Sequence, residues 1–187
     1  GILVDKFMKT NQEDVYAIGD CAQFKEAVLG RRNIEQVWYT GRIMGESLSR
    51  TLTGERTAYQ PGHWFNSAKF FDLEYQTYGW VFPSVRNGES HFYWEHADGM
   101  KCIRINYEKV GGKLIGLNTF GIRLRHQVLD KWLTEERSID YIVGHMRDAN
   151  FDPEFYKGFE KDLKESFEQQ TGRTIELKKR SLKRIFG

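Results

Sequence analysis

The stretch that most constrains this chain is a short apolar run ending in Gly-Asp, Val15-Tyr16-Ala17-Ile18-Gly19-Asp20. Runs of this length that stop at a turn residue are typical of a buried β-strand. The glycine allows the backbone to turn sharply and approach a ligand closely. The aspartate can present its carboxylate in the crevice where open α/β sheets bind ligands. We therefore expect a strand at residues 15–18 and a ligand-facing turn at Gly19 and Asp20.

The segments around this run predict a small αβ unit. Residues 2–4 are apolar and indicate a second short strand, and we expect a helix over residues 34–52. Gly41 and Gly45 are four residues apart, so they lie on one side of that helix and permit close packing against another backbone. Gly54 is a typical helix-ending glycine.

A β-rich section follows a linker at residues 55–62, where we expect a domain boundary. Residues 70–79 form one aromatic run, which we interpret as a strand. Asp98-Gly99, between residues 90–97 and 101–109, is a hairpin signal. Residues 101–109 alternate, with Ile103, Ile105 and Tyr107 on one face. Residues 113–120 then complete an antiparallel meander.

Helices dominate the remaining sequence. An apolar stripe predicts one helix near residues 128–133, and Ser138 is a good N-cap for a second. Asp152-Pro153 has the pattern that opens a third helix, which Gly172 ends. The predicted stripe of this third helix consists of Phe155, Phe159, Leu163 and Phe167. A basic tail begins at Arg173, and its default interpretation is a solvated or disordered segment.

The composition limits the possible functions. The net charge of the 187 residues is +2, so the chain is not a polyanion binder by composition. Only two cysteines occur and their spacing fits no zinc motif, so we expect no metal site and a reducing, cytoplasmic location. No apolar run approaches the length of a membrane span, and no signal peptide is recognisable at Gly1. We therefore expect no membrane association.

At this point the motifs resemble a known family. Gly1 to Asp5, then Thr10, then Val15 to Ala22 is similar to the second flavin-binding motif of the FAD-dependent pyridine nucleotide-disulfide oxidoreductases. The helix with Thr40-Gly41-Arg42 and the meander followed by helices also resemble this family, the latter its C-terminal interface domain. Residues 64–67 resemble the start of that domain in the ferredoxin- and rubredoxin-reductase branch.

The resemblance implies a fold and a set of cofactor-binding residues. The fold class is α+β, with a remnant of the FAD-domain βα unit and an interface domain built on a three- to five-stranded antiparallel sheet. Asp20, after Gly19, corresponds to the residue that hydrogen-bonds a ribityl hydroxyl of FAD. A helix beginning near Glu35, Gln36 and Val37 would direct its dipole at the flavin's N1–C2=O edge. The remaining expected flavin contact is Trp64.

The sequence lacks other parts that the resemblance requires. No two glycines are spaced i, i+2, so the chain has no Gly-x-Gly-x-x-Gly dinucleotide motif. We expect the C-terminal part of a longer NAD(P)H oxidoreductase, inactive alone, with the parent's N-terminal FAD and NAD domains as partners. The expected layout is an FAD-domain piece at 1–56, an interface domain at 57–150, and an extra helix and basic tail at 151–187. No catalytic residue is assigned.

Two alternatives remain open. The aromatic-rich segment is also compatible with a non-catalytic dimerisation or binding module, and a homodimer is expected in either case. The basic residues after Gly172 could contact phosphate, and such nucleic-acid binding would weaken steeply with salt. It is the weaker of the two alternatives.

Overall fold

The computed structural model describes residues 1–27, 31–151 and 158–178. The chain divides into two compact units, Gly1–Asn66 and Ser67–Gly187. The division lies beyond the expected boundary at residues 56/57. Residues after 56 stay with the first unit because Tyr59 is buried there: its ring stacks on Phe24 at 5.0 Å, and its N–H donates to the Lys6 carbonyl.

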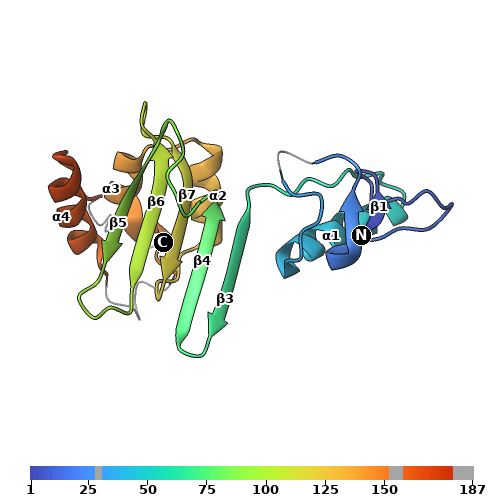
Figure 1. Cartoon of the computed structure of the whole chain (residues 1–187), viewed down its shortest axis with the longest axis horizontal. Helices are drawn as coiled ribbons and strands as arrows, with labels where there is room; N and C mark the ends of the chain where they lie inside the picture. Colours follow the sequence, from blue (N-terminus) through green and yellow to red (C-terminus); the bar gives the residue numbers. More distant parts are fainter. Residues whose placement is uncertain (28–30, 152–157, 179–187) are drawn as a thin grey trace, which may run out of the picture. The chain divides into compact units, whose positions relative to one another are not determined.

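The first unit consists of a two-stranded parallel sheet followed by one α-helix. Strand β1 (Ile2–Val4) pairs in parallel with β2 (Ala22–Phe24), which follows a short 3₁₀ helix, η1 (Gly19–Cys21). Helix α1 (Trp38–Leu52) completes it (Figure 1). The core residues of this unit are Val4, Met8, Ala17, Ala22, Phe24, Met44 and Tyr59, with Ile43 and Leu48 packed against them.

Two sequence expectations for this unit are wrong. Residues 15–18 form no strand: in the described residues 1–27, Tyr16 makes only an isolated bridge with Lys9. A strand needs a neighbour for its backbone hydrogen bonds, and β1 pairs with β2 instead. Helix α1 begins at Trp38 rather than at residue 34, since Val37 is extended, with φ −136° and ψ 130°.

The second unit is built on a five-stranded antiparallel sheet. Its strands are β3 (Phe65–Phe70), β4 (Leu73–Gly79), β5 (Glu89–Glu95), β6 (Cys102–Glu108) and β7 (Leu114–Phe120). Their order in the sheet is β3-β4-β7-β6-β5. The predicted hairpin and meander are confirmed by the pairing of β5 with β6 and of β6 with β7. The predicted aromatic strand is wrong in its extent, because Phe71, with φ 52°, turns the chain between β3 and β4.

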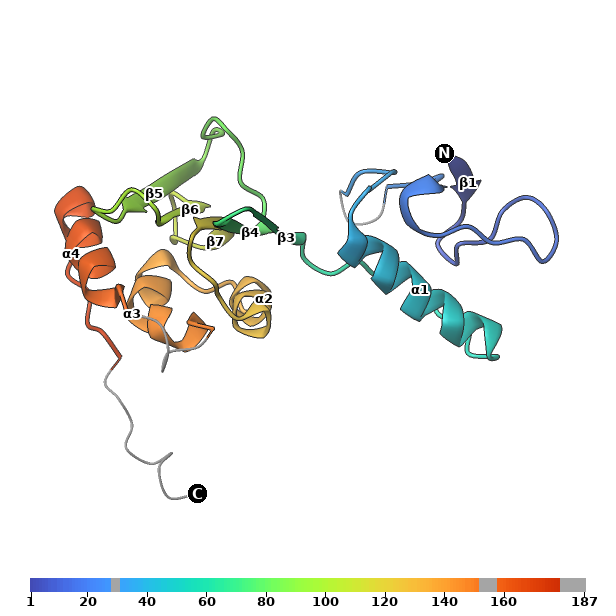
Figure 2. The same ribbon diagram turned by 90° about the horizontal axis from the view of Figure 1, so that it is seen from below.

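Helices cover one face of this sheet. They are α2 (His126–Thr134), α3 (Ile139–Ala149) and α4 (Glu160–Thr171), which lie on the same side in Figure 2. The Ser138 side chain accepts a hydrogen bond from the Tyr141 N–H, which confirms the predicted N-cap. Gly172 ends α4 with φ 69°, as predicted.

The C-terminal segment differs in part from its expectation. The predicted helix opening at Asp152-Pro153 and the stripe residue Phe155 lie outside the described residues. The start of the basic tail is not a free segment, because Ile175 is buried and the Lys178 N–H donates to the Gly144 carbonyl of α3. The backbone N–H of Ile175 also donates to the Glu168 carboxylate at 2.7 Å.

The α+β fold class is confirmed by these elements. In the part of the chain that the structure describes, no helix has the length and apolarity needed to cross a bilayer.

Candidate functional site

The expected turn at Gly19 is confirmed, and it lies against the first turn of α1. Gly19 has φ 75°, a left-handed conformation that favours glycine. Its N–H points at the Met44 sulfur, 3.3 Å away. A Cβ on Gly41 would lie 3.4 Å from the Gly19 Cα, so the predicted close packing against another backbone is present at Gly41, whereas Gly45 faces the side chain of Ile18. The sharp turn and the glycine side of α1 therefore fix Asp20 beside the start of the helix.

Asp20 is exposed at the surface of the first unit. Within the described residues its carboxylate makes no hydrogen bond or ion pair. The nearest polar side chain along the chain, Cys21, is also exposed, and its thiol donates to the Ile18 carbonyl at 3.5 Å. The Asp20 carboxylate can therefore accept hydrogen bonds from a ligand without giving up an internal partner.

Helix α1 has an uncapped amino terminus. Its N-cap residue, Val37, has no side chain that can accept a hydrogen bond from the first N–H groups of the helix, and no acidic residue lies in its first turn. Such a helix end carries a partial positive charge and unsatisfied N–H donors, which suit a negatively charged group. Trp38, the first helical residue, is 69% exposed.

The expected contact residues before the helix differ in their surroundings. Gln36 is exposed and Val37 is half-buried, so both can border a ligand at the helix start. Glu35 is buried instead, with its carboxylate bound to Arg31 at 2.6 Å and to the Thr40 hydroxyl at 3.0 Å. A direct flavin contact by the Glu35 side chain is therefore not supported.

Trp64 belongs to the same cluster as Glu35. The Arg31 guanidinium lies 4.9 Å from the centroid of the Trp64 ring, and it donates to the Gly62 carbonyl at 3.1 Å. Sequence reasoning missed Arg31, because the i, i+4 rule that would pair it with Glu35 applies to helices and residues 31–37 form none. It also missed Tyr59. Burial raises the pKa of Tyr59 to about 12. The positive charge of Arg31 lowers this pKa, and the negative charge of Glu35 raises it by less than burial does.

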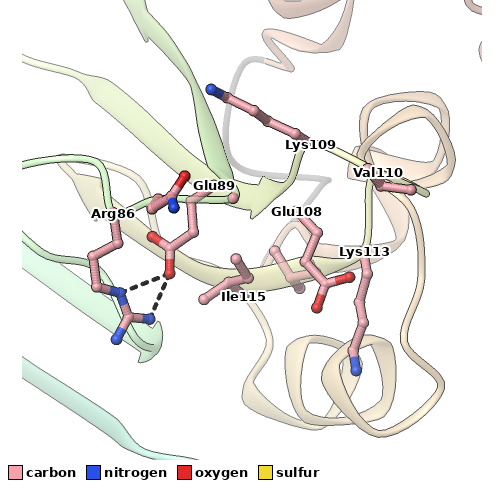
Figure 3. A pocket seen from close by; sticks show the side chains of 10 residues that line it. Arg86, Glu89, Glu108, Lys109, Val110, Lys113 and Ile115 are labelled. Atoms are coloured by element: carbon pink, nitrogen blue, oxygen red, sulfur yellow. Dashed lines mark hydrogen bonds and ion pairs between the residues drawn. The ribbon is translucent and has the colours of Figure 1, made fainter.

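The second unit contains an open pocket of about 690 Å³ at one end of its sheet, with several charged side chains around it. Figure 3 shows Arg86 paired with Glu89 on one side and Glu108 and Lys113 on the other. None of the expected site residues lines it. Among the described residues, no group of three or more His, Cys, Asp or Glu side chains could hold a metal ion.

The fold of this chain is similar to parts of several solved structures. No known family model matches the chain. An NAD-dependent persulfide reductase from A. fulgidus is 21% identical with a TM-score of 0.53, over 76% of this chain and 29% of that chain. An FAD-dependent pyridine nucleotide-disulphide oxidoreductase from Desulfovibrio vulgaris is 17% identical with a TM-score of 0.53, over 76% and 37%.

A third solved structure covers more of the chain. The ferredoxin reductase for the CYP199A2 system from Rhodopseudomonas palustris is 22% identical, with a TM-score of 0.50, over 89% of this chain and 36% of that chain. The chain thus spans 29–37% of the length of these three solved structures. It has a fold that FAD-dependent pyridine nucleotide-disulphide oxidoreductases and ferredoxin reductases contain, as the sequence resemblance implied.

Proposed function

We propose that this chain is the C-terminal part of a flavoprotein that moves electrons from NAD(P)H through FAD to an acceptor. The observation that carries the proposal is the turn at Gly19 and Asp20, held against α1 by Gly41. It supplies an exposed carboxylate beside an uncapped helix start. This pair of features suits a cofactor that has both hydroxyl donors and an edge that becomes negative.

The residues of the first unit fit this cofactor in a specific way. The Asp20 carboxylate would accept a hydrogen bond from a ribityl hydroxyl, and bonds to an ionised group are the stronger kind. The start of α1, near Gln36 and Val37, would stabilise negative charge on the reduced flavin. When bound, FAD supplies the chemistry of accepting a hydride and passing electrons onward.

The exposed apolar surface of β1 supports the fragment part of the proposal. Parallel strands normally have both faces covered. Here Ile2 is 49% and Leu3 is 51% exposed. A further layer of the parent's FAD domain would cover these side chains, and the NAD domain would supply the dinucleotide-binding glycines. We therefore expect this chain alone to be inactive.

The direct experiment compares this chain with the protein of the intact reading frame. A frame that is longer at the amino terminus by about 300 residues would accommodate two nucleotide-binding domains. That protein should show a flavin absorption spectrum and oxidise NADH or NADPH. Stoichiometric flavin and NADH oxidation by the purified 187-residue chain would contradict the fragment part of the proposal.

A second candidate function is a dimerisation module of the same fold. It is favoured by the tip of the β3–β4 hairpin, where Phe70 is 61% and Phe71 is 97% exposed. Aromatic side chains this exposed are enriched at protein interfaces. The occupant that we expect is a second copy of the chain, because the same hairpin tip on each copy would give a closed, twofold contact. A chain that remains monomeric at high concentration by light scattering would exclude it.

A further inference from the structure

The first unit contains a buried ion pair that the proposed function does not explain. Arg31 and Glu35 have side chains only 7% and 5% exposed. Two parallel bonds join them, from Arg31 Nη2 to Glu35 Oε2 at 2.6 Å and from Arg31 Nε to Glu35 Oε1 at 2.7 Å. Removing two charges from water costs several kcal/mol per ion, and good geometry offsets this cost only in part. Stability alone is therefore a weak reason for the pair.

The pair joins three segments of the first unit. Arg31 Nη1 donates to the Gly62 carbonyl in the linker, and the Arg31 guanidinium lies over the Trp64 ring. Glu35 Oε2 also accepts from the Thr40 hydroxyl in the first turn of α1, at 3.0 Å. The loop before α1, the first turn of α1 and the linker are thus bound to one carboxylate–guanidinium unit.

These contacts hold the chain that leads into the helix start, and they leave the first N–H groups of α1 uncapped. No side chain caps α1, and residues 31–37 form no helix or strand. Glu35 reaches over the N-cap residue to Thr40, so it fixes the direction in which the chain enters the helix. From this arrangement we infer that Arg31 and Glu35 are positioning residues: they set the conformation of residues 36–40 and thereby aim the amino terminus of α1 at the flavin, without touching it. This inference rests on the proposed function.

The chain offers a matched control for this inference. Arg42 and Glu46 have the same i, i+4 spacing within the same unit, with a bond of 2.8 Å. Their side chains are 62% and 59% exposed, so the pair interacts weakly in solvent. Replacing Glu46 by Gln removes the same charge as Glu35→Gln, from an exposed pair that includes no residue of the loop before α1.

The first measurement is amide hydrogen exchange at residues 41–44 in this chain, because their N–H groups donate to the carbonyls of residues 37–40, beginning with Gly41 N–H to the Val37 carbonyl at 3.1 Å. Glu35→Gln keeps the volume of the side chain and removes its charge, and Thr40→Val removes only the hydroxyl that reaches Glu35. Both should speed exchange at these amides by about tenfold or more, because local opening becomes easier. Glu46→Gln should leave it unchanged. Equal exchange in Glu35→Gln, Thr40→Val and Glu46→Gln would overturn the inference.

The second measurement is the flavin reduction potential of the protein of the intact reading frame. If the pair aims the helix dipole, Glu35→Gln makes the flavin reduction potential more negative. Arg31→Gln does the same, and Arg31→Lys, which keeps the charge, shifts the potential less than Arg31→Gln does. Faster exchange with an unchanged potential would show a purely structural pair and overturn the positioning role. If the wild-type protein of the intact reading frame holds no flavin, the proposed function is refuted, and so is the role of the pair in aiming the helix at flavin. The hydrogen-exchange result still decides whether the pair fixes residues 36–40.

Discussion

The Asp20 carboxylate is available to a ligand because the fold does not use it. It is exposed, and no described residue bonds to it. We predict that Asp20→Ala, in the protein of the intact reading frame, weakens FAD binding by about 10- to 100-fold, the effect of losing a hydrogen bond to a charged group. The thermal unfolding midpoint should not change, since no internal contact is lost. Quenching of flavin fluorescence on titration measures the affinity.

The control for this variant is Glu13→Ala, which removes another exposed carboxylate of the first unit. It should bind FAD like the wild type. If Asp20→Ala and Glu13→Ala have the same affinity as the wild type, Asp20 does not bind the ribityl chain, even if the protein contains flavin.

Tyr59 gives a prediction that does not depend on flavin. Its hydroxyl is buried and has no hydrogen-bond partner among the described residues, and burial raises its pKa from 10.0 to about 12. Because the folded-state pKa is raised, Tyr59 ionises first in the unfolded chain, and its contribution to stability is complete below pH 10 and lost as pH rises toward 12. The free energy of unfolding should therefore fall less steeply over this range in Tyr59→Phe than in the wild type. Urea unfolding at several alkaline pH values tests this, and parallel curves would contradict it.

At the scale of elements, local signals predicted those parts whose partners lie nearby in sequence. The β5–β6 hairpin followed from Asp98-Gly99, and Ile103, Ile105 and Tyr107 are buried on one face as their alternation indicated. Ser138 caps α3 because its hydroxyl reaches an N–H three residues away. Such contacts need no knowledge of distant residues.

The incorrect predictions concern segments whose structure depends on residues that are distant in the sequence. Val15 to Ile18 has the composition of a strand, but a strand requires a pairing neighbour, and none of the described strands pairs with it. Helix α1 begins at Trp38, after the extended Val37, although the sequence alone indicated a helix from residue 34. The turn at Gly19 was predictable from its own residue type, but the burial of Glu35 was not, because its partner Arg31 binds Gly62 at the end of the linker and lies over Trp64.

Helix α4 is an integral part of the second unit, although the resemblance left its role open. The Phe167 side chain is fully buried and meets the Phe92 ring edge-on at 5.1 Å, and Phe159 stacks on Trp94 at 5.5 Å. We predict that Phe167→Ala lowers the free energy of unfolding by about 3–5 kcal/mol, through lost burial and a residual cavity. Gln169→Ala, at an exposed position of the same helix, should change it by less than about 0.5 kcal/mol. Chemical denaturation measures both, and a small effect of Phe167→Ala would indicate that α4 is only loosely attached.

At the scale of the whole molecule, each unit exposes apolar side chains, and the two sets have different explanations. In the first unit they lie on a parallel strand pair, Ile2 and Leu3, whose faces the parent's other domains would cover. In the second unit one such set, Phe70 and Phe71, lies at the tip of an antiparallel hairpin, where no further layer of the same sheet is expected. Ile2 and Leu3 therefore predict a contact with another domain of the same polypeptide, whereas Phe70 and Phe71 predict a contact with a second molecule.

Phe71 allows the intermolecular partner to be tested against the stability of the monomer. Its φ of 52° is unfavourable for a phenylalanine and tolerable for an asparagine, and its side chain is 97% exposed. If Phe71 serves a contact between two copies, Phe71→Asn should stabilise the monomer by about 1 kcal/mol, by relief of backbone strain, and at the same time abolish association. Val110→Asn, which replaces a residue 86% exposed in another turn, should leave association intact. Sedimentation velocity over a range of concentrations reports association, and denaturation at low concentration reports stability. A Phe71→Asn protein that is more stable but still associates would place the contact elsewhere. If the wild type and Phe71→Asn are both monomeric at every concentration, the chain is not a dimerisation module.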